Sequence, residues 1–119
     1  MPVTVTATPL GTPLIRLAGD FDLNNVVQVE AALTEAFEGD HHGLIIDLTG
    51  VDFLDSMMLR QIAAAHERAQ SLDRRLVVVR PDPIMWRVFT ITGLASVIPS
   101  SASVDEAEDQ LAPTPSAER

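Results

Sequence analysis

The amino-acid sequence predicts an α/β fold, with a mixed four- to five-stranded sheet flanked by three to four helices. First, short runs of aliphatic and β-branched residues alternate with longer segments whose apolar residues recur every three or four positions. Second, the succession of strand, helix and strand makes two βαβ units, whose strands must run parallel. Third, 119 residues of which 46% are hydrophobic suffice for one core, so we expect a single domain over residues 1–111.

A hairpin and a helix are expected to come first. "VTVTA" at 3–7 alternates with period two, and after a turn rich in proline and glycine, "LIRLAG" at 14–19 forms the second strand. Within residues 20–40 the period becomes that of a helix, and Asn25 with Gln28 resembles a capping box at its start. The antiparallel hairpin is what makes the predicted sheet mixed.

The centre of the chain predicts two buried strands with a helix between them. "GLIIDL" at 43–48 and "RLVVVR" at 75–80 are short apolar runs typical of strands buried on both faces. A turn at 49–55 is expected to lead into a helix over about 56–72. We expect His66 to be a hydrogen-bonded structural residue on the inward side of this helix. That inward side is predicted to carry Leu59, Ile62, Ala63, His66 and Ala69.

A third helix is expected to begin at "PDP". Asp82 can cap it and Pro83 can occupy its first position, and Gly93 ends it. A short final strand is expected at 95–99. The inward stripe of the third helix is predicted to be Ile84 or Met85, Val88, Phe89 and Ile91.

The end of the chain is polar and acidic. Ser103 and Glu106 match a capping box, which predicts a short docked helix. Residues 112–119 are expected to be a disordered tail.

The charge of the chain excludes several classes of function. The net charge is −9, from 17 acidic against 8 basic residues, and every basic residue is arginine. This charge repels phosphate backbones and anionic membranes, so we expect no nucleic acid and no membrane as partner, but a protein with a basic face. The chain has no cysteine, so disulfides and thiolate metal sites are excluded. Since it shows no bilayer-spanning run and no signal-peptide pattern, the expected location is cytoplasmic.

The parallel strands predict where a functional site lies. Their carboxyl ends meet at one edge of the sheet, where open α/β sheets usually carry their sites. That edge collects Asp20, Asp22, residues 52–58 and residues 82–86. The segment "DSMM" at 55–58 falls there, at the junction of strand and helix.

Ser56 in this segment has three alternative roles: helix cap, catalytic nucleophile, or switch read by another protein. A nucleophile needs a base within hydrogen-bond reach, but His66 lies about 15 Å along the same helix. His41 and His42 belong at the opposite edge, and the glycines of a nucleophile elbow are missing. The sequence therefore does not predict an enzyme.

Metal and cofactor chemistry is not expected either. Asp20, Asp22, Asp52 and Asp55 resemble the carboxylates of an aspartyl-phosphate receiver, but such a domain also relies on a lysine that this chain lacks. Two adjacent histidines in a polar loop are usually solvated rather than metal ligands. No cofactor and no metal are predicted.

Helix capping alone accounts for Ser56 but not for the residues behind it. In the first turn of the helix, at least one of Met57 and Met58 should be exposed. Methionine is a flexible apolar residue that suits a surface fitting a partner. A partner-binding switch accounts for all three residues.

Three segments together resemble STAS domains, in particular the bacterial anti-sigma factor antagonists. "GLIIDLTGVDFLDSMMLRQIAAAHERA" is similar to the family signature, in which an apolar strand is followed by Asp-Leu-Ser/Thr-Gly, then Val-x-Phe-x-Asp-Ser-Ser-Gly-Leu and a helix. "LAGDFDLNN" resembles the family's Gly-Glu-Leu-Asp segment, and "VFTITGLASVI" its Phe-x-x-x-Gly-Leu segment. The three matches keep their order and spacing across about residues 10–99.

The resemblance implies a small STAS-type domain that acts by binding. Its partner would be an anti-sigma factor, a GHKL-type serine kinase, and binding would release the sigma factor. Ser56 would be the phosphoacceptor, Asp55 the adjacent motif carboxylate and Asp22 the loop carboxylate. A PPM-type phosphatase would restore the unphosphorylated form. The alternative is a phosphorylation-independent STAS interaction module, such as a scaffold or a component of a transporter complex.

The chain departs from the family pattern at two places. Met57-Met58 stand where the family has Ser-Gly, and Trp86 stands where it usually has a polar residue. Trp86 lies about 200° around its helix from Val88, so it is expected to point away from the core. We therefore expect Trp86, Met57 and Met58 to share one partner-facing apolar surface; the alternative is that Trp86 packs under the C-terminal segment. The predicted acidic rim of the shared surface is Asp22, Asp55 and Asp82.

Overall fold

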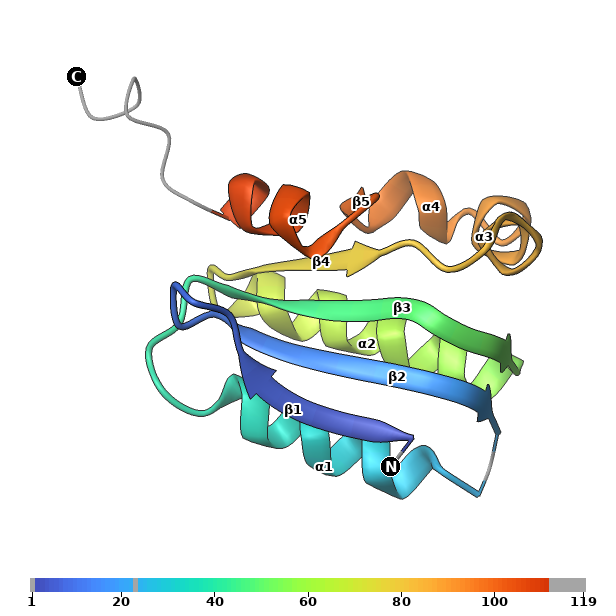
Figure 1. The fold of residues 1–119 in the computed structure, drawn as a ribbon, viewed down its shortest axis with the longest axis horizontal. Helices are drawn as coiled ribbons and strands as arrows, with labels where there is room; N and C mark the ends of the chain where they lie inside the picture. Colours follow the sequence, from blue (N-terminus) through green and yellow to red (C-terminus); the bar gives the residue numbers. More distant parts are fainter. Residues whose placement is uncertain (1, 23, 112–119) are drawn as a thin grey trace.

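The computed structural model describes residues 2–22 and 24–111, so the predicted tail at 112–119 lies outside the described residues. In this described part, the hairpin, the two βαβ units and the third helix follow one another in the expected order (Figure 1). Their order is β1 (Val3–Ala7), β2 (Pro13–Phe21), α1 (Val26–Phe37), β3 (Gly43–Leu54), α2 (Ser56–Ser71), β4 (Arg75–Val79), α3 (Pro83–Ile91), α4 (Leu94–Val97), β5 (Ser100–Ser101) and α5 (Val104–Leu111).

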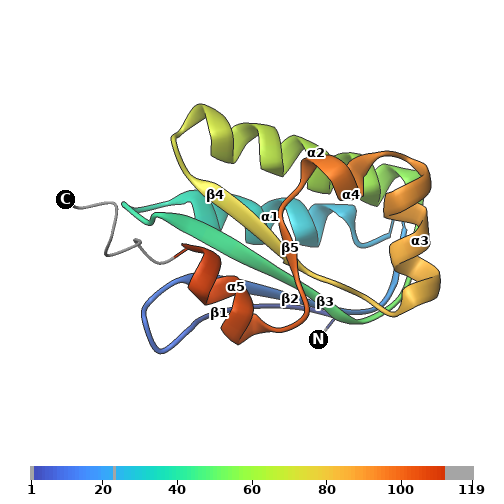
Figure 2. The same cartoon turned by 90° about the horizontal axis from the view of Figure 1, so that it is seen from above.

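The five strands form one mixed sheet in the order β1-β2-β3-β4-β5. β1 pairs antiparallel with β2, and the remaining pairs are parallel, which confirms the predicted hairpin and βαβ units. Figures 1 and 2 show α1 and α2 on one face of the sheet and α5 on the other, with α3 beside the carboxyl ends of the strands. In the described residues, no helix is both long and apolar enough to span a membrane.

The sheet is buried on both faces at its centre. Leu76 and Val78 of β4 join the larger core beneath α1 and α2, whereas Val77 and Val79 join a smaller core beneath α5. Ala107 of α5 is fully buried in this smaller core. This two-sided burial is why the apolar runs of β3 and β4 lack the alternation of a half-exposed strand.

β3 is longer than predicted. The turn expected at 49–55 is wrong, because β3 continues to Leu54. β2 stays paired with it through two register shifts, so that Ala18 faces Gly50 and Phe21 faces Leu54. Each shift places one extra residue in β3, and the strand keeps its ladder although its side chains no longer alternate regularly.

The chain after α3 also differs from the prediction. The strand expected at 95–99 is wrong, because residues 94–97 form the short helix α4. Gly93, in the left-handed conformation with φ 85°, lets the chain leave α3 and begin this new turn. A two-residue strand, β5, follows and pairs with the end of β4.

Candidate functional site

The two central strands end side by side and place their following loops next to each other. Phe21 at the end of β2 pairs with Leu54 at the end of β3, and the Asp55 N–H donates to the Phe21 carbonyl oxygen at 3.1 Å. Asp22 and Asp55 therefore leave neighbouring strands at the same edge of the sheet. The expected meeting of these two loops is confirmed.

Asp55, and not Ser56, caps α2. The Asp55 Oδ1 atom accepts a hydrogen bond from the Met58 N–H at 3.0 Å, which satisfies one of the free donors of the first turn. Ser56 is the first helical residue and is exposed. The capping role that could have accounted for Ser56 is therefore wrong, and its hydroxyl faces solvent at the start of the helix.

Asp22 organises the loop between β2 and α1. Its Oδ1 atom accepts the Asn24 N–H at 2.9 Å, and its own N–H donates to the Asn25 Oδ1 atom at 3.0 Å. Asn25 is thereby engaged with the loop and makes no side-chain bond to the α1 terminus, so the capping box predicted from Asn25 and Gln28 is wrong. The half-buried Asp22 carboxylate is held beside Asp55 by local hydrogen bonds.

The two methionines after Ser56 have opposite environments. Met57 is 40% exposed, whereas Met58 is 0% exposed and belongs to the main core. Consecutive residues of a helix lie about 100° apart, so only one of them can face solvent here. The prediction that Met58 contributes to a partner-facing surface is wrong, because its side chain is the one that anchors α2 to the sheet.

Trp86 is half-buried rather than exposed. Its ring stacks on Phe89 with centroids 5.0 Å apart and an interplanar angle of 23°, and it packs against the main core. The Arg80 guanidinium lies 6.0 Å from the ring centroid on another side. The prediction that Trp86 points away from the core is therefore wrong, since Trp86 forms part of the packing between α3 and the sheet.

The stripe predicted for α3 is only partly correct. Met85 and Phe89 are buried, and Asp82 caps the helix by accepting the Met85 N–H at 2.9 Å, as expected. Ile84 and Ile91, however, are 80% and 74% exposed. The core-facing line of α3 passes through Met85 and Phe89, so the two isoleucines lie on the solvent side.

Two apolar residues at this edge are exposed, which was not predicted from the sequence. Phe53 near the end of β3 is 49% exposed, and Ile84, the second residue of α3, is 80% exposed; α3 contacts β3. The exposure of Phe53 could not be predicted from the sequence pattern, because the register shifts in β3 decide which way its side chain points. We call the exposed and half-buried residues that end β2 and β3 and begin α2 and α3 the Ser56 surface, namely Asp22, Phe53, Asp55, Ser56, Met57 and Ile84.

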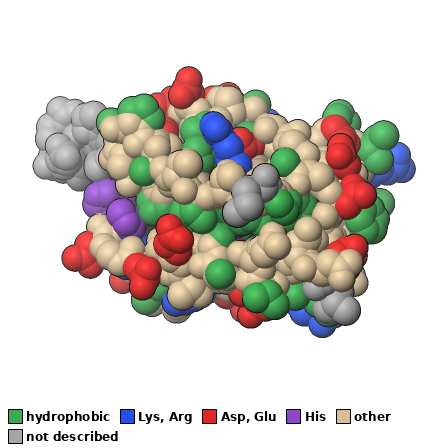
Figure 3. Space-filling view, turned by 60° about the horizontal axis from the view of Figure 1, so that its bottom comes forward, with side chains coloured by type: hydrophobic (Ala, Val, Ile, Leu, Met, Phe, Trp, Pro, Cys, Tyr) green, Lys and Arg blue, Asp and Glu red, His purple; other side chains and the backbone are tan. Residues whose placement is uncertain are grey.

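The Ser56 surface combines apolar and acidic side chains. Asp20, Asp52 and Asp82 are exposed around it. The right-hand end of Figure 3, where β2 and β3 terminate, shows acidic and hydrophobic side chains side by side, with a basic side chain at its margin. Apolar contact area with an acidic rim suits a protein partner that presents a basic face.

The surface offers little for catalysis. His42 and His66 line a cavity at the other end of α2, so neither can serve Ser56 as a base. Over residues 2–22 and 24–111, no three acidic or histidine side chains converge closely enough to hold a metal ion. The arrangement is suited to binding and to modification of an exposed hydroxyl.

Comparison with known proteins agrees with these features. A model of the STAS domain family matches residues 4–107. The anti-sigma F factor antagonist of Lysinibacillus sphaericus is 31% identical over 84 residues, which cover 70% of this chain and 72% of that protein.

Solved structures share the fold. An anti-sigma factor antagonist from Mycobacterium paratuberculosis superposes with a TM-score of 0.77 at 24% identity, and the match covers 92% of each chain. The Bacillus cell fate determinant SpoIIAA in its phosphorylated form gives a TM-score of 0.71 at 24% identity, covering 92% of this chain and 99% of that one. The mixed five-stranded sheet with its helices is therefore an architecture known from such antagonists.

Proposed function

This chain belongs to the STAS domain family, among the anti-sigma factor antagonists, and we propose that phosphorylation of Ser56 switches its binding to an anti-sigma factor. Such antagonists are regulators that act by binding and not by catalysis. In the proposed cycle, the unphosphorylated chain binds an anti-sigma factor of the GHKL serine-kinase type in the cytoplasm, and the sigma factor is released. The kinase phosphorylates Ser56, and a PPM-type phosphatase removes the phosphate.

The observation that carries this proposal is that Asp55 caps α2 and leaves the Ser56 hydroxyl free. Phosphorylation adds a charge of about −1.5 to −2 without removing a bond that the fold needs. At a helix N-terminus such a charge is favoured by about 0.3–1 kcal/mol, while Asp55 and the net charge of −9 oppose it. These opposing contributions are of similar size, so the fold should tolerate the phosphate.

An interface would not tolerate it equally. Met57 is exposed directly after Ser56, and Phe53 near the end of β3 is exposed as well, so both would lose water on contact with a partner that covers this edge of the sheet. A partner that buries the neutral hydroxyl would instead face a desolvated dianion, and burying an uncompensated charge is costly. The same phosphate should therefore change the stability of the fold little but weaken partner binding strongly.

Of the two positions after Ser56 that depart from the family pattern, only one changes the surface of the protein. Of the two methionines that stand where the family has Ser-Gly, Met58 points into the core and leaves the surface unchanged. Met57 alone remains beside Ser56 and could obstruct a kinase. The exposed Met57 favours the second candidate function, a STAS module that binds its partner without being phosphorylated.

Substitution of Ser56 should separate the two candidates. With wild type, Ser56→Ala and Ser56→Asp as baits in affinity capture, we expect the first two to recover a GHKL-type kinase and Ser56→Asp to lose it. Calorimetry with the recovered kinase should show at least tenfold weaker binding for Ser56→Asp, about 1.4 kcal/mol, at an almost unchanged melting temperature.

Ser96→Asp provides the matched control, because it adds the same charge at an exposed position of α4, away from the Ser56 surface. It should bind like wild type. If Ser56→Asp binds as tightly as wild type, or loses its fold, the switch is refuted. Recovery of membrane or transporter proteins in place of a kinase would select the phosphorylation-independent module.

A further inference from the structure

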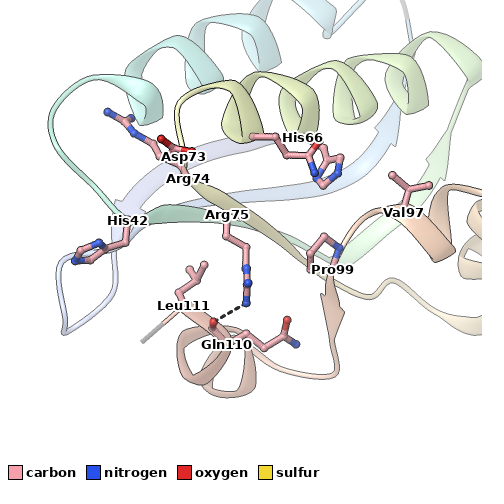
Figure 4. A pocket seen from close by; sticks show the side chains of 10 residues that line it. His42, His66, Asp73, Arg74, Arg75, Val97, Pro99, Gln110 and Leu111 are labelled. Carbon is pink, nitrogen blue, oxygen red and sulfur yellow. Dashed lines mark hydrogen bonds between the residues drawn. The ribbon is translucent and has the colours of Figure 1, made fainter. Parts of the chain in front are cut away.

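A large polar cavity lies at the end of the molecule opposite to Ser56. It measures about 720 Å³ and is bordered by the second half of α2, the start of β4, the segment before β5, and α5 (Figure 4). Among its lining residues are His42, His66, Gln70, Arg75, Pro99 and Gln110. We call it the His66 cavity. Its volume is in the range of pockets that hold small molecules.

His66 is buried in the wall of this cavity without a partner. Its side chain is only 5% exposed, and neither Nδ1 nor Nε2 makes a hydrogen bond within the described part of the chain. The prediction of a hydrogen-bonded structural histidine is therefore wrong. Figure 4 shows the imidazole extending from α2 into the cavity toward Pro99. Leaving a buried donor and acceptor unpaired costs free energy, and both ring nitrogens are shielded, so a group in the cavity would bond to them after a small shift of the ring or of the cavity wall.

Two of the eight arginines of this acidic protein border the same cavity. Arg74 and Arg75 line it together with one carboxylate, that of Asp73. The Arg74 guanidinium is held in place by the carbonyl oxygens of Phe37 at 2.7 Å and Gly39 at 2.6 Å. Arg74 is thus directed toward the loop after α1, and Arg75 is the guanidinium that the cavity offers to an anion.

The Arg75 guanidinium has more N–H donors than the one hydrogen bond it makes. It is exposed, and in the described residues its guanidinium makes one side-chain hydrogen bond, to the Gln110 carbonyl oxygen at 3.2 Å. A guanidinium carries five N–H donors in a planar fork, which matches the oxygens of a phosphate or carboxylate. The exposed Gln70 side chain on α2 adds an amide to the same wall.

We propose that the His66 cavity binds a small organic anion, a phosphate- or carboxylate-bearing metabolite. Its anionic group pairs with Arg75, and a hydroxyl or heteroatom beside that group bonds to His66. The cavity is separate from the Ser56 surface, so this proposal stands or fails independently of the phosphorylation switch.

Nuclear magnetic resonance of the histidine and arginine side chains tests this site directly. Inorganic phosphate and citrate are the two probes, each titrated at constant ionic strength against sodium chloride. With only three histidines in the chain, the His66 ring signals are readily assigned. We expect saturable shifts of the His66 ring nitrogens and of the Arg75 Nε–H with a Kd below about 10 mM, and the tighter probe identifies the preferred anion.

Two matched variants make the test specific. Gln70→Glu places a carboxylate at the cavity wall and should weaken anion binding at least about tenfold. Gln61→Glu makes the same change on the same helix but faces a different groove, and it should bind like wild type. Shifts that stay linear or match those in sodium chloride, or equal binding by Gln70→Glu and wild type, would overturn the proposal.

Discussion

Replacement of Met58 by alanine should lower the free energy of unfolding by about 2–5 kcal/mol, whereas Met57→Ala should lower it by less than about 0.5 kcal/mol. Met58 is 0% exposed in the main core, and its truncation leaves a cavity between α2 and the sheet. Met57 is 40% exposed and does not belong to the main core. The same substitution at two consecutive positions therefore separates packing from contact with a partner.

Urea unfolding of both variants, followed by circular dichroism, measures this difference. Binding should show the opposite order: Met57→Ala should weaken anti-sigma factor binding by on the order of 1 kcal/mol, whereas folded Met58→Ala should bind like wild type. Equal stability of the two variants would contradict the inward orientation of Met58.

The second large effect is expected at Trp86. Trp86→Ala should cost about 2–3 kcal/mol of stability, somewhat below the roughly 3–5 kcal/mol typical of a fully buried tryptophan. The loss comes from the stacked contact with Phe89 and from the apolar area that the ring covers on the core. Tryptophan emission should be blue-shifted already in the free protein.

Ile84→Ala is the control for this prediction, because Ile84 belongs to the same helix but is 80% exposed. It should change the unfolding free energy by less than about 0.5 kcal/mol. Two results together would show that Trp86 is exposed, as the sequence predicted. These are a red-shifted emission of the free protein, and a loss of unfolding free energy in Trp86→Ala no larger than that in Ile84→Ala.

The wrong prediction for Trp86 shows that helical periodicity alone does not determine which side of α3 faces the core. At 100° per residue, a stripe centred between Met85 and Phe89 places Trp86 and Val88 about 80° to either side, hence half-buried. A stripe centred on Val88 and Ile91 fits the apolar pattern as well but exposes Trp86. Only the docking of α3 against the sheet decides between these two, and that contact is not encoded in the spacing.

The main elements were predictable because their burial leaves a strong pattern. β4 and the first half of β3 are covered on both faces, and α2 has one apolar side. The continuation of β3 to Leu54 was not predictable, because it depends on two register shifts against β2. The burial of His66 was likewise predictable, but its lack of partners depends on how α5 and the segment before β5 border the cavity.

The site was predicted as a region more reliably than as a set of side chains. Parallel topology correctly brought Asp22, Asp55 and Ser56 to one edge. Only Ser56 was considered from the sequence as the cap of α2, although the side chain of the adjacent Asp55 can accept a first-turn N–H equally well. The backbone settles it: Asp55 is extended with ψ 176°, as a cap residue must be, and Ser56 is already helical.

The proposed switch is tested most directly by incubating the chain with its anti-sigma factor and ATP. Intact-mass spectrometry should show one added phosphate, fragment spectra should map it to Ser56, and Ser56→Ala should remain unlabelled. The phosphorylated chain should then dissociate from the kinase while its melting temperature stays nearly constant. A kinase that binds the chain but never labels it, or that labels Ser56→Ala equally well, would contradict the role proposed for Ser56.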